Sequence, residues 1–165
     1  MPAIPKPELH RLVLAALEDA SPAHGALEDV PFLLQAKGLI PVAIYAFTVT
    51  DPPGGRDADE LKIQLIAPGQ GKGERGSLPA PDEDTCPILL GYSRHYDVFV
   101  LWDAYKHVDF SFSKNCQVRL QPLVDASLTG IGKQARQLRS TGLETILAAR
   151  PDHLHAALAE RIRTV

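Results

Sequence analysis

The sequence has little of what marks secreted, membrane or strongly basic proteins. Its two cysteines, Cys86 and Cys116, are too few for a disulfide framework, so we expect a protein of the reducing cytoplasm. No run of about 18 apolar residues is present, which argues against a transmembrane helix and predicts no membrane partner. The apolar stretch near the N-terminus is interrupted by Glu18 and Asp19 and lacks a following cleavage site, which is not typical of a signal peptide.

Positive charge is not in excess either. The chain has 17 Lys and Arg residues against 20 Asp and Glu residues, which gives a formal net charge of −3. This balance excludes a chain coated in basic residues, although a local basic patch is compatible with it. What the chain does have is 45% hydrophobic and 22% charged residues over 165 positions. That composition excludes disorder and supplies a sizeable core, so we expect a single domain spanning residues 1–165.

Local patterns predict a helical start followed by a sheet. In the N-terminal part, residues 1–38, apolar residues recur every three or four positions between Leu9 and Leu17, which predicts a helix. A second short helix is predicted over residues 30–37, with Gly38 at its end. In the sheet part, residues 40–121, β-branched and aromatic residues predict five strands, at 40–50, 61–67, 88–92, 97–104 and 110–120.

The C-terminal part, residues 122–165, is predicted to be helical again. Helices are expected over 123–128, 133–139 and 151–163, whereas residues 144–149 fit either a strand or a helix. The fold class that follows is α+β, with a curved, mainly antiparallel sheet or pseudobarrel flanked by N- and C-terminal helices.

Aromatic residues are concentrated in one segment. Seven of the ten lie between residues 92 and 112. Phe99 and Trp102 belong to an apolar strand, where aromatic rings are most often core. Tyr92, Tyr96 and Tyr105 stand beside charged or turn residues, so we expect their rings at strand ends. Such rings can stack on bases or line a pocket for an extruded base.

Cations are interleaved with these aromatic residues and also occur in a glycine-rich loop, residues 68–87. A helix over 133–139 would place Lys133, Arg136 and Arg139 on one side. Charge runs are usually solvated faces, but cations mixed with aromatic rings are also typical of nucleic-acid surfaces. The candidate phosphate contacts are Lys72, Arg75, Arg94, Lys106 and Lys114, and the candidate base contacts are Tyr92, His95, Tyr96, Tyr105 and Asn115.

Two alternatives remain open from the residues alone. The spacing Glu60-x-Lys62 with Asp51 upstream matches a PD-(D/E)xK-type nuclease, which holds Mg²⁺ with its acids, but so short a pattern is common by chance. The tyrosines could instead line the pocket of a protein-interaction or small-ligand module. The cysteines and histidines lack the paired spacing of a zinc site. We therefore predict no metal, cofactor or catalytic residue in this chain alone.

Four segments resemble a known family. They are Lys62-Ile63-Gln64, Leu89-Leu90-Gly91-Tyr92, the run from Asp97 to Asp103, and the run from Phe110 to Val118. These resemble the methylase-associated recognition domains of bacterial restriction enzymes and methylases, over roughly residues 40–150; the loop 68–87 departs from that pattern. The resemblance implies a module that binds double-stranded DNA or senses its modification in a restriction or phage-defence system. Its partner would be a nuclease or motor domain on another segment or polypeptide.

Overall fold

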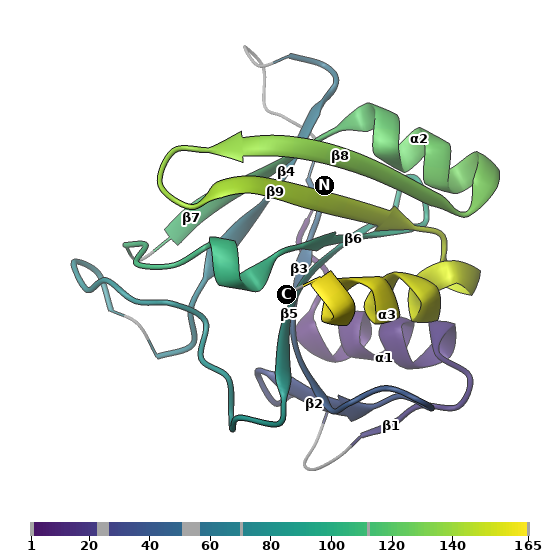
Figure 1. Ribbon diagram of the computed structural model, residues 1–165, viewed down its shortest axis with the longest axis horizontal. Coiled ribbons are helices and arrows are strands. Elements are labelled where there is room, and N and C mark those ends of the chain that lie inside the picture. Colours follow the sequence, from purple (N-terminus) through teal and green to yellow (C-terminus); the bar gives the residue numbers. More distant parts are fainter. Residues whose placement is uncertain (1, 23–26, 51–56, 70, 112, 165) are drawn as a thin grey trace.

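Three layers make up the protein, as the computed structural model shows (Figure 1). The structure describes residues 2–22, 27–50, 57–69, 71–111 and 113–164. A seven-stranded sheet is the middle layer. Helices α1 (Lys6–Ala16) and α3 (Leu154–Thr164) cover one face, and the other face is covered by α2 (Leu120–Thr129) and a two-stranded ribbon of β4 (Glu60–Ile66) and β7 (Ser113–Arg119).

The large sheet is open and mostly antiparallel. Its strand order is β1-β2-β3-β5-β6-β9-β8, and only the β3–β5 pair within it is parallel. The chain leaves β3 for the ribbon layer before it returns to β5, which is the kind of crossover that a parallel pair requires. The strands are β1 (Ser21–Pro22), β2 (Phe32–Gln35), β3 (Val42–Thr48), β5 (Cys86–Ser93), β6 (Val98–Trp102), β8 (Ile131–Leu138) and β9 (Gly142–Ala149), with short 3-10 turns η1 (Ala104–Lys106) and η2 (Pro151–His153). The α+β class is confirmed, and the sheet as described does not close into a barrel.

The central strands are buried on both faces because each layer supplies its own core. Along β6, Phe99 and Leu101 face the helices while Val100 and Trp102 face the ribbon. Every residue of β5 and β6 is buried, which explains their nearly continuous apolar sequence. The expectation that Phe99 and Trp102 are core is confirmed, since their exposed fractions are 1% and 0%.

Two predicted helices are strands. Residues 30–37 contain β2, which pairs antiparallel with β3, and residues 133–138 lie in β8, which pairs with β9. Residues 144–149 belong to β9, so the described part from 122 to 164 is a helix, a hairpin and a helix rather than helical throughout. The reason is tertiary: β8 is a polar edge strand whose conformation comes from pairing, not from an apolar repeat.

The strand conformation of β8 also separates its cations. Lys133 lies 2.5 Å from Glu160 of α3, on the helix side of the sheet. Arg136 donates to the Gln117 side chain in β7 at 2.7 Å, on the ribbon side. The expectation that 133, 136 and 139 share one helix side is therefore wrong. Gly132 marks the closest approach to α2, because a Cβ there would lie 2.1 Å from the Pro122 carbonyl oxygen.

No helix within the described part of the chain is long and apolar enough to cross a membrane.

Replacing Trp102 with alanine tests the ribbon-side core. The indole is fully buried, and its Nε1 donates to the Gln117 carbonyl at 3.0 Å, so the change removes both packing and a link to the ribbon. We expect a loss of about 3–5 kcal/mol in the free energy of unfolding, measured by urea denaturation. Leu128→Ala, at a side chain that is 75% exposed, should stay within about 0.5 kcal/mol of the parent. Equal losses in the two variants would contradict the assigned core.

Candidate nucleic-acid interface

The ten predicted contact residues do not form one surface. Arg94, His95 and Tyr96 lie in the turn that joins β5 to β6. Tyr105 and Lys106 lie beyond the other end of β6. Because β6 runs between these two groups, they are at opposite ends of the sheet. The remaining residues lie in the long loop (Lys72 and Arg75), within β5 (Tyr92) and on β7 (Lys114 and Asn115).

The tyrosines differ in accessibility. Tyr92 is 6% exposed, its ring lies 4.9 Å from that of Phe99, and its hydroxyl donates to Asp97 at 2.6 Å. Burial, followed by that hydrogen bond, raises the pKa of Tyr92. Tyr92 does lie near the end of β5, as expected, but its ring belongs to the core. Tyr96 is half-buried with His95 edge-on at 4.7 Å, and Tyr105 is 52% exposed.

Most of the predicted cations have partners inside the protein. Arg75 lies 3.0 Å from the Asp109 carboxylate and also donates to the Asp109 carbonyl. Arg94 lies 2.8 Å from Glu8 of α1. Lys106 donates to the Thr141 carbonyl at 3.0 Å. Lys72 is exposed in the loop. These contacts tie loops to the body of the protein, so the cations are only partly available to a ligand.

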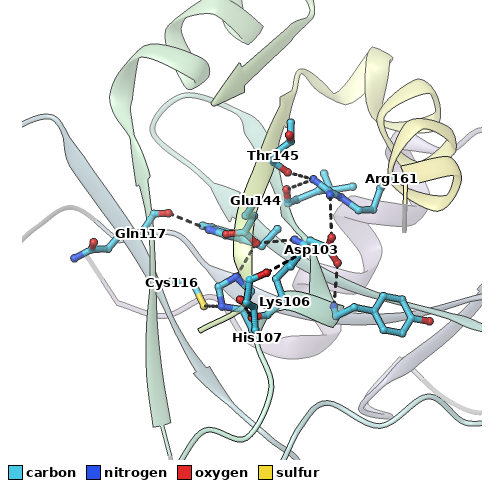
Figure 2. A network of polar contacts seen from close by, with 12 residues as sticks. Asp103, Lys106, His107, Cys116, Gln117, Glu144, Thr145 and Arg161 are labelled. Atoms are coloured by element: carbon cyan, nitrogen blue, oxygen red, sulfur yellow. Dashed lines mark hydrogen bonds and ion pairs between the residues drawn. The ribbon is translucent and has the colours of Figure 1, made fainter. Parts of the chain in front are cut away.

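A buried polar network that the sequence did not predict surrounds the end of β6 (Figure 2). Glu144 of β9 is 1% exposed, and its Oε2 accepts from the Asp103 backbone at 2.9 Å and lies 2.7 Å from His107 Nε2. Arg161 of α3 donates to the Leu101 carbonyl at 3.2 Å and to the Thr145 carbonyl, with Asp103 Oδ2 at 3.9 Å. Burial lowers the pKa of Arg161, against the opposing effect of these acids.

One side of this network has the order of a catalytic triad. His107 stands between Glu144 and Cys116, with 3.6 Å from its Nδ1 to the Cys116 Sγ. A nucleophilic cysteine needs access and a lowered pKa. Cys116 has the opposite properties, because it is 1% exposed and burial raises its pKa to about 12. We therefore interpret the arrangement as structural: it connects β7, β9 and the turn after β6. Its sequence signal was weak: one glutamate in the otherwise apolar strand β9.

The outer face of the ribbon gathers side chains suited to DNA. The β4–β7 register places Lys62 opposite Gln117 and Gln64 opposite Asn115. Their neighbours Leu61, Ile63, Cys116 and Val118 are buried against the sheet, so all four polar side chains point away from the core. Lys62 Nζ donates to Asn115 Oδ1 at 3.3 Å.

Strand β8 extends this polar surface. Besides the bond from Arg136 to Gln117, the Gln134 side chain accepts from the Arg119 backbone at 2.7 Å. A small cavity of 170 Å³ lies between the ribbon and β8. Arg119 itself is 3.2 Å from Asp59 and 3.8 Å from Asp57. We call the set Lys62, Gln64, Asn115, Gln117, Gln134 and Arg136 the amide–cation face.

Only Asn115 of the amide–cation face was among the predicted contact residues. Lys62 was predicted as part of the nuclease motif and of a segment that resembles the family, not as a DNA contact. The signal that could have found Gln64 and Gln117 is the alternation in segments 60–65 and 115–119, where every second side chain is polar.

The nuclease motif is only partly visible. Glu60 and Lys62 are two residues apart on β4, so their side chains point to the same side of the strand. Glu60 lies opposite Arg119 in the register. Asp51 lies outside the described residues. Within the described ranges, no three His, Cys, Asp or Glu residues are grouped so that they could hold a metal ion.

Comparison with known proteins gives a class for this fold and surface. Residues 40–158 match the family model described as methylase-associated X1, a match that covers well over half of the chain. The protein is thus a methylase-associated module of restriction-type systems. Within that class, it belongs to the methylase-associated X1 family. No curated protein and no solved structure matches the chain.

Replacing Glu144 with alanine tests the buried network. The change leaves the Asp103 amide and the His107 ring without their acceptor, and it removes a carboxylate near the buried Arg161. Breaking a buried charged cluster on one side costs about 3–5 kcal/mol, and we expect a loss of that size in urea denaturation. Glu18→Ala, at an exposed position, is the matched control. A Glu144→Ala variant as stable as that control would show that the network is dispensable.

Proposed function

We propose that this chain is the DNA-recognition module of a restriction or phage-defence system, and that it binds duplex DNA through the amide–cation face. Membership of a methylase-associated family supports a role beside enzymes that act on DNA. One observation carries the proposal. Two adjacent cross-strand pairs of the ribbon, Lys62 with Gln117 and Gln64 with Asn115, direct their four polar side chains away from the core.

These side chains match the chemistry of base edges. Asn and Gln amides can donate and accept together, which fits the N6 and N7 groups of adenine, and Lys donates to the O6 and N7 groups of guanine. The major groove admits a two-stranded β-ribbon. Amide side chains held by Lys62 and Arg136, at 3.3 Å and 2.7 Å, are oriented before DNA arrives, which lowers the cost of ordering them.

Local charge favours this face despite the net charge of −3. Lys62 and Arg136 bond to neutral amides rather than to carboxylates, and the carboxylate beside them in the small cavity, Glu60, stands opposite Arg119. By contrast, Arg75 and Arg94 are paired with acids. Exposed Lys72, His95 and Tyr105 remain candidates for peripheral contacts.

The module is proposed to distinguish modified from unmodified DNA and to direct a methylase, nuclease or motor partner. A major-groove reader contacts the groove in which base methyl groups project, so a methyl group changes its fit directly. Duplexes that differ only in methylation test this part. Equal affinities for every methylated and unmethylated pair would remove it and leave plain DNA recognition.

Salt-dependent gel shifts test DNA binding itself. If about four to five phosphates are neutralised, log affinity should fall against log salt with a slope of roughly −4. No binding at low salt, or affinity that does not change with salt, would contradict the proposal. Adding Mg²⁺ or Mn²⁺ to the same reactions tests the alternative: cleavage that Glu60→Ala abolishes would replace recognition with nuclease activity.

Asn115→Ala and Gln64→Ala test the assigned face. Both side chains are exposed, so folding should be unaffected, whereas each loss of a base contact should cost about 1–3 kcal/mol of binding on the preferred sequence. Gln35→Ala removes an exposed amide from β2 and should bind as the parent does. If Lys72→Ala or Arg94→Ala weakened binding and the two ribbon variants did not, DNA would lie elsewhere.

A further inference from the structure

A second concave site lies beside the amide–cation face. A cavity of 690 Å³ is enclosed by the N-terminal segment and α1 on one side and by β3 and β4 on the other. This volume lies within the range of small-molecule pockets, about 300–1,000 Å³. Its lining includes Ile4, Lys6, Phe47, Lys62, Gln64 and Ile66. Neither the network in Figure 2 nor the proposed duplex contacts explain it.

The lining combines apolar walls with positive charge. Ile4, Phe47 and Ile66 are apolar, and the two charged groups are Lys6 and Lys62; no carboxylate occurs among the described residues that line the cavity. Lys6 Nζ lies 3.8 Å from the centre of the Phe47 ring and donates to the Ala46 carbonyl. Burial lowers the pKa of Lys6 to about 8, which leaves it mostly protonated at neutral pH. Such a pocket fits an anion that carries a planar apolar group.

The cavity and the amide–cation face share residues. Lys62 and Gln64 belong to both, so DNA that contacts these two side chains on the ribbon also meets the lining of the cavity. A nucleotide has the required chemistry, with a flat base and an anionic phosphate. Rotating a nucleotide out of a duplex costs only a few kcal/mol, which pocket contacts can offset.

We propose that this cavity binds a single nucleotide, with its base against the apolar wall beside Phe47 and its phosphate near Lys6 and Lys62. The nucleotide has two possible sources, one extruded from bound DNA or one free in solution. The first rests on the proposed function, and the second does not. Ile4, Lys6 and Leu9, which also lines the cavity, precede the region that matches the family model.

Two variants alter the cavity without touching the ribbon. Lys6→Met keeps an unbranched apolar side chain and removes the charge, and Ala3→Trp places a bulky ring at an exposed lining position. Lys37→Met removes an exposed lysine beyond β2 and serves as the matched control. Thermal unfolding of all three confirms that they fold.

The first measurement uses 2-aminopurine placed in turn along a duplex that the parent binds, because its fluorescence rises when it leaves the base stack. We expect a rise of at least about threefold at one position with the parent and with Lys37→Met. Both cavity variants should lose it, while their affinities in gel shifts stay within about threefold of the parent. A rise that the cavity variants retain would overturn the proposal, because the base would then be unstacked elsewhere.

The second measurement titrates the four deoxynucleoside monophosphates into the protein by calorimetry. Binding that Lys6→Met and Ala3→Trp abolish supports the proposal with a free nucleotide as the source, even if no duplex binds. Absence of both the calorimetric and the fluorescence signal overturns it. Since gel shifts report duplex binding separately, failure of the cavity and failure of the proposed function give different results.

Discussion

A carboxylate with almost no access to water holds the end of the sheet together. The Oε2 atom of Glu144 accepts from the Asp103 backbone N–H at 2.9 Å and lies 2.7 Å from His107 Nε2, and these two groups take the place of water at that oxygen. The nearby cation comes from Arg161 on α3, the last helix. A buried charge tolerates little displacement of its partners. The positions of β9, of the turn after β6 and of α3 are therefore coupled, and α3 in turn closes the core on the helix side of the sheet.

The packing of α1 and α3 on one face of the sheet, and of α2 and the ribbon on the other, determines which surfaces a ligand can contact. Both faces of β5 and β6 are buried in core packing, so these central strands are not accessible to a ligand. The ribbon is different, because only Leu61, Ile63 and their inward neighbours are committed to the core. Trp102 joins the two layers through the Gln117 carbonyl, while the Gln117 side chain stays on the outer side with Arg136. The core contacts and the proposed DNA contacts thus lie on opposite faces of the same two strands.

The sequence predicted the parts whose pattern is local. Continuous apolar runs identified β5 and β6, and apolar residues at helical spacing identified α1, α2 and α3. It failed for β2 and β8, whose conformation depends on pairing with β3 and β9. The predicted site failed for a similar reason. Nearness in sequence grouped Tyr92 with His95, but Tyr92 lies within β5 with its ring in the core, whereas His95 lies exposed in the turn after that strand. The face that the ribbon forms depends on register between residues about 50 positions apart, which no local pattern contains.

The family match and the core do not have the same boundaries. The matched region begins at residue 40, yet Leu9 and Val13 of α1 belong to one buried cluster with Leu154 and Leu158 of α3. Helix α1 is thus a structural part of the fold and also one wall of the cavity beside the ribbon. If both proposals hold, contact with the duplex comes from the matched region and selection of a nucleotide comes partly from the segment before it. Among the described residues, the cavity lining and the amide–cation face share Lys62 and Gln64. Substitutions at exposed lining positions of the N-terminal segment would therefore change which nucleotide is bound, while the affinity of the ribbon for DNA stayed the same.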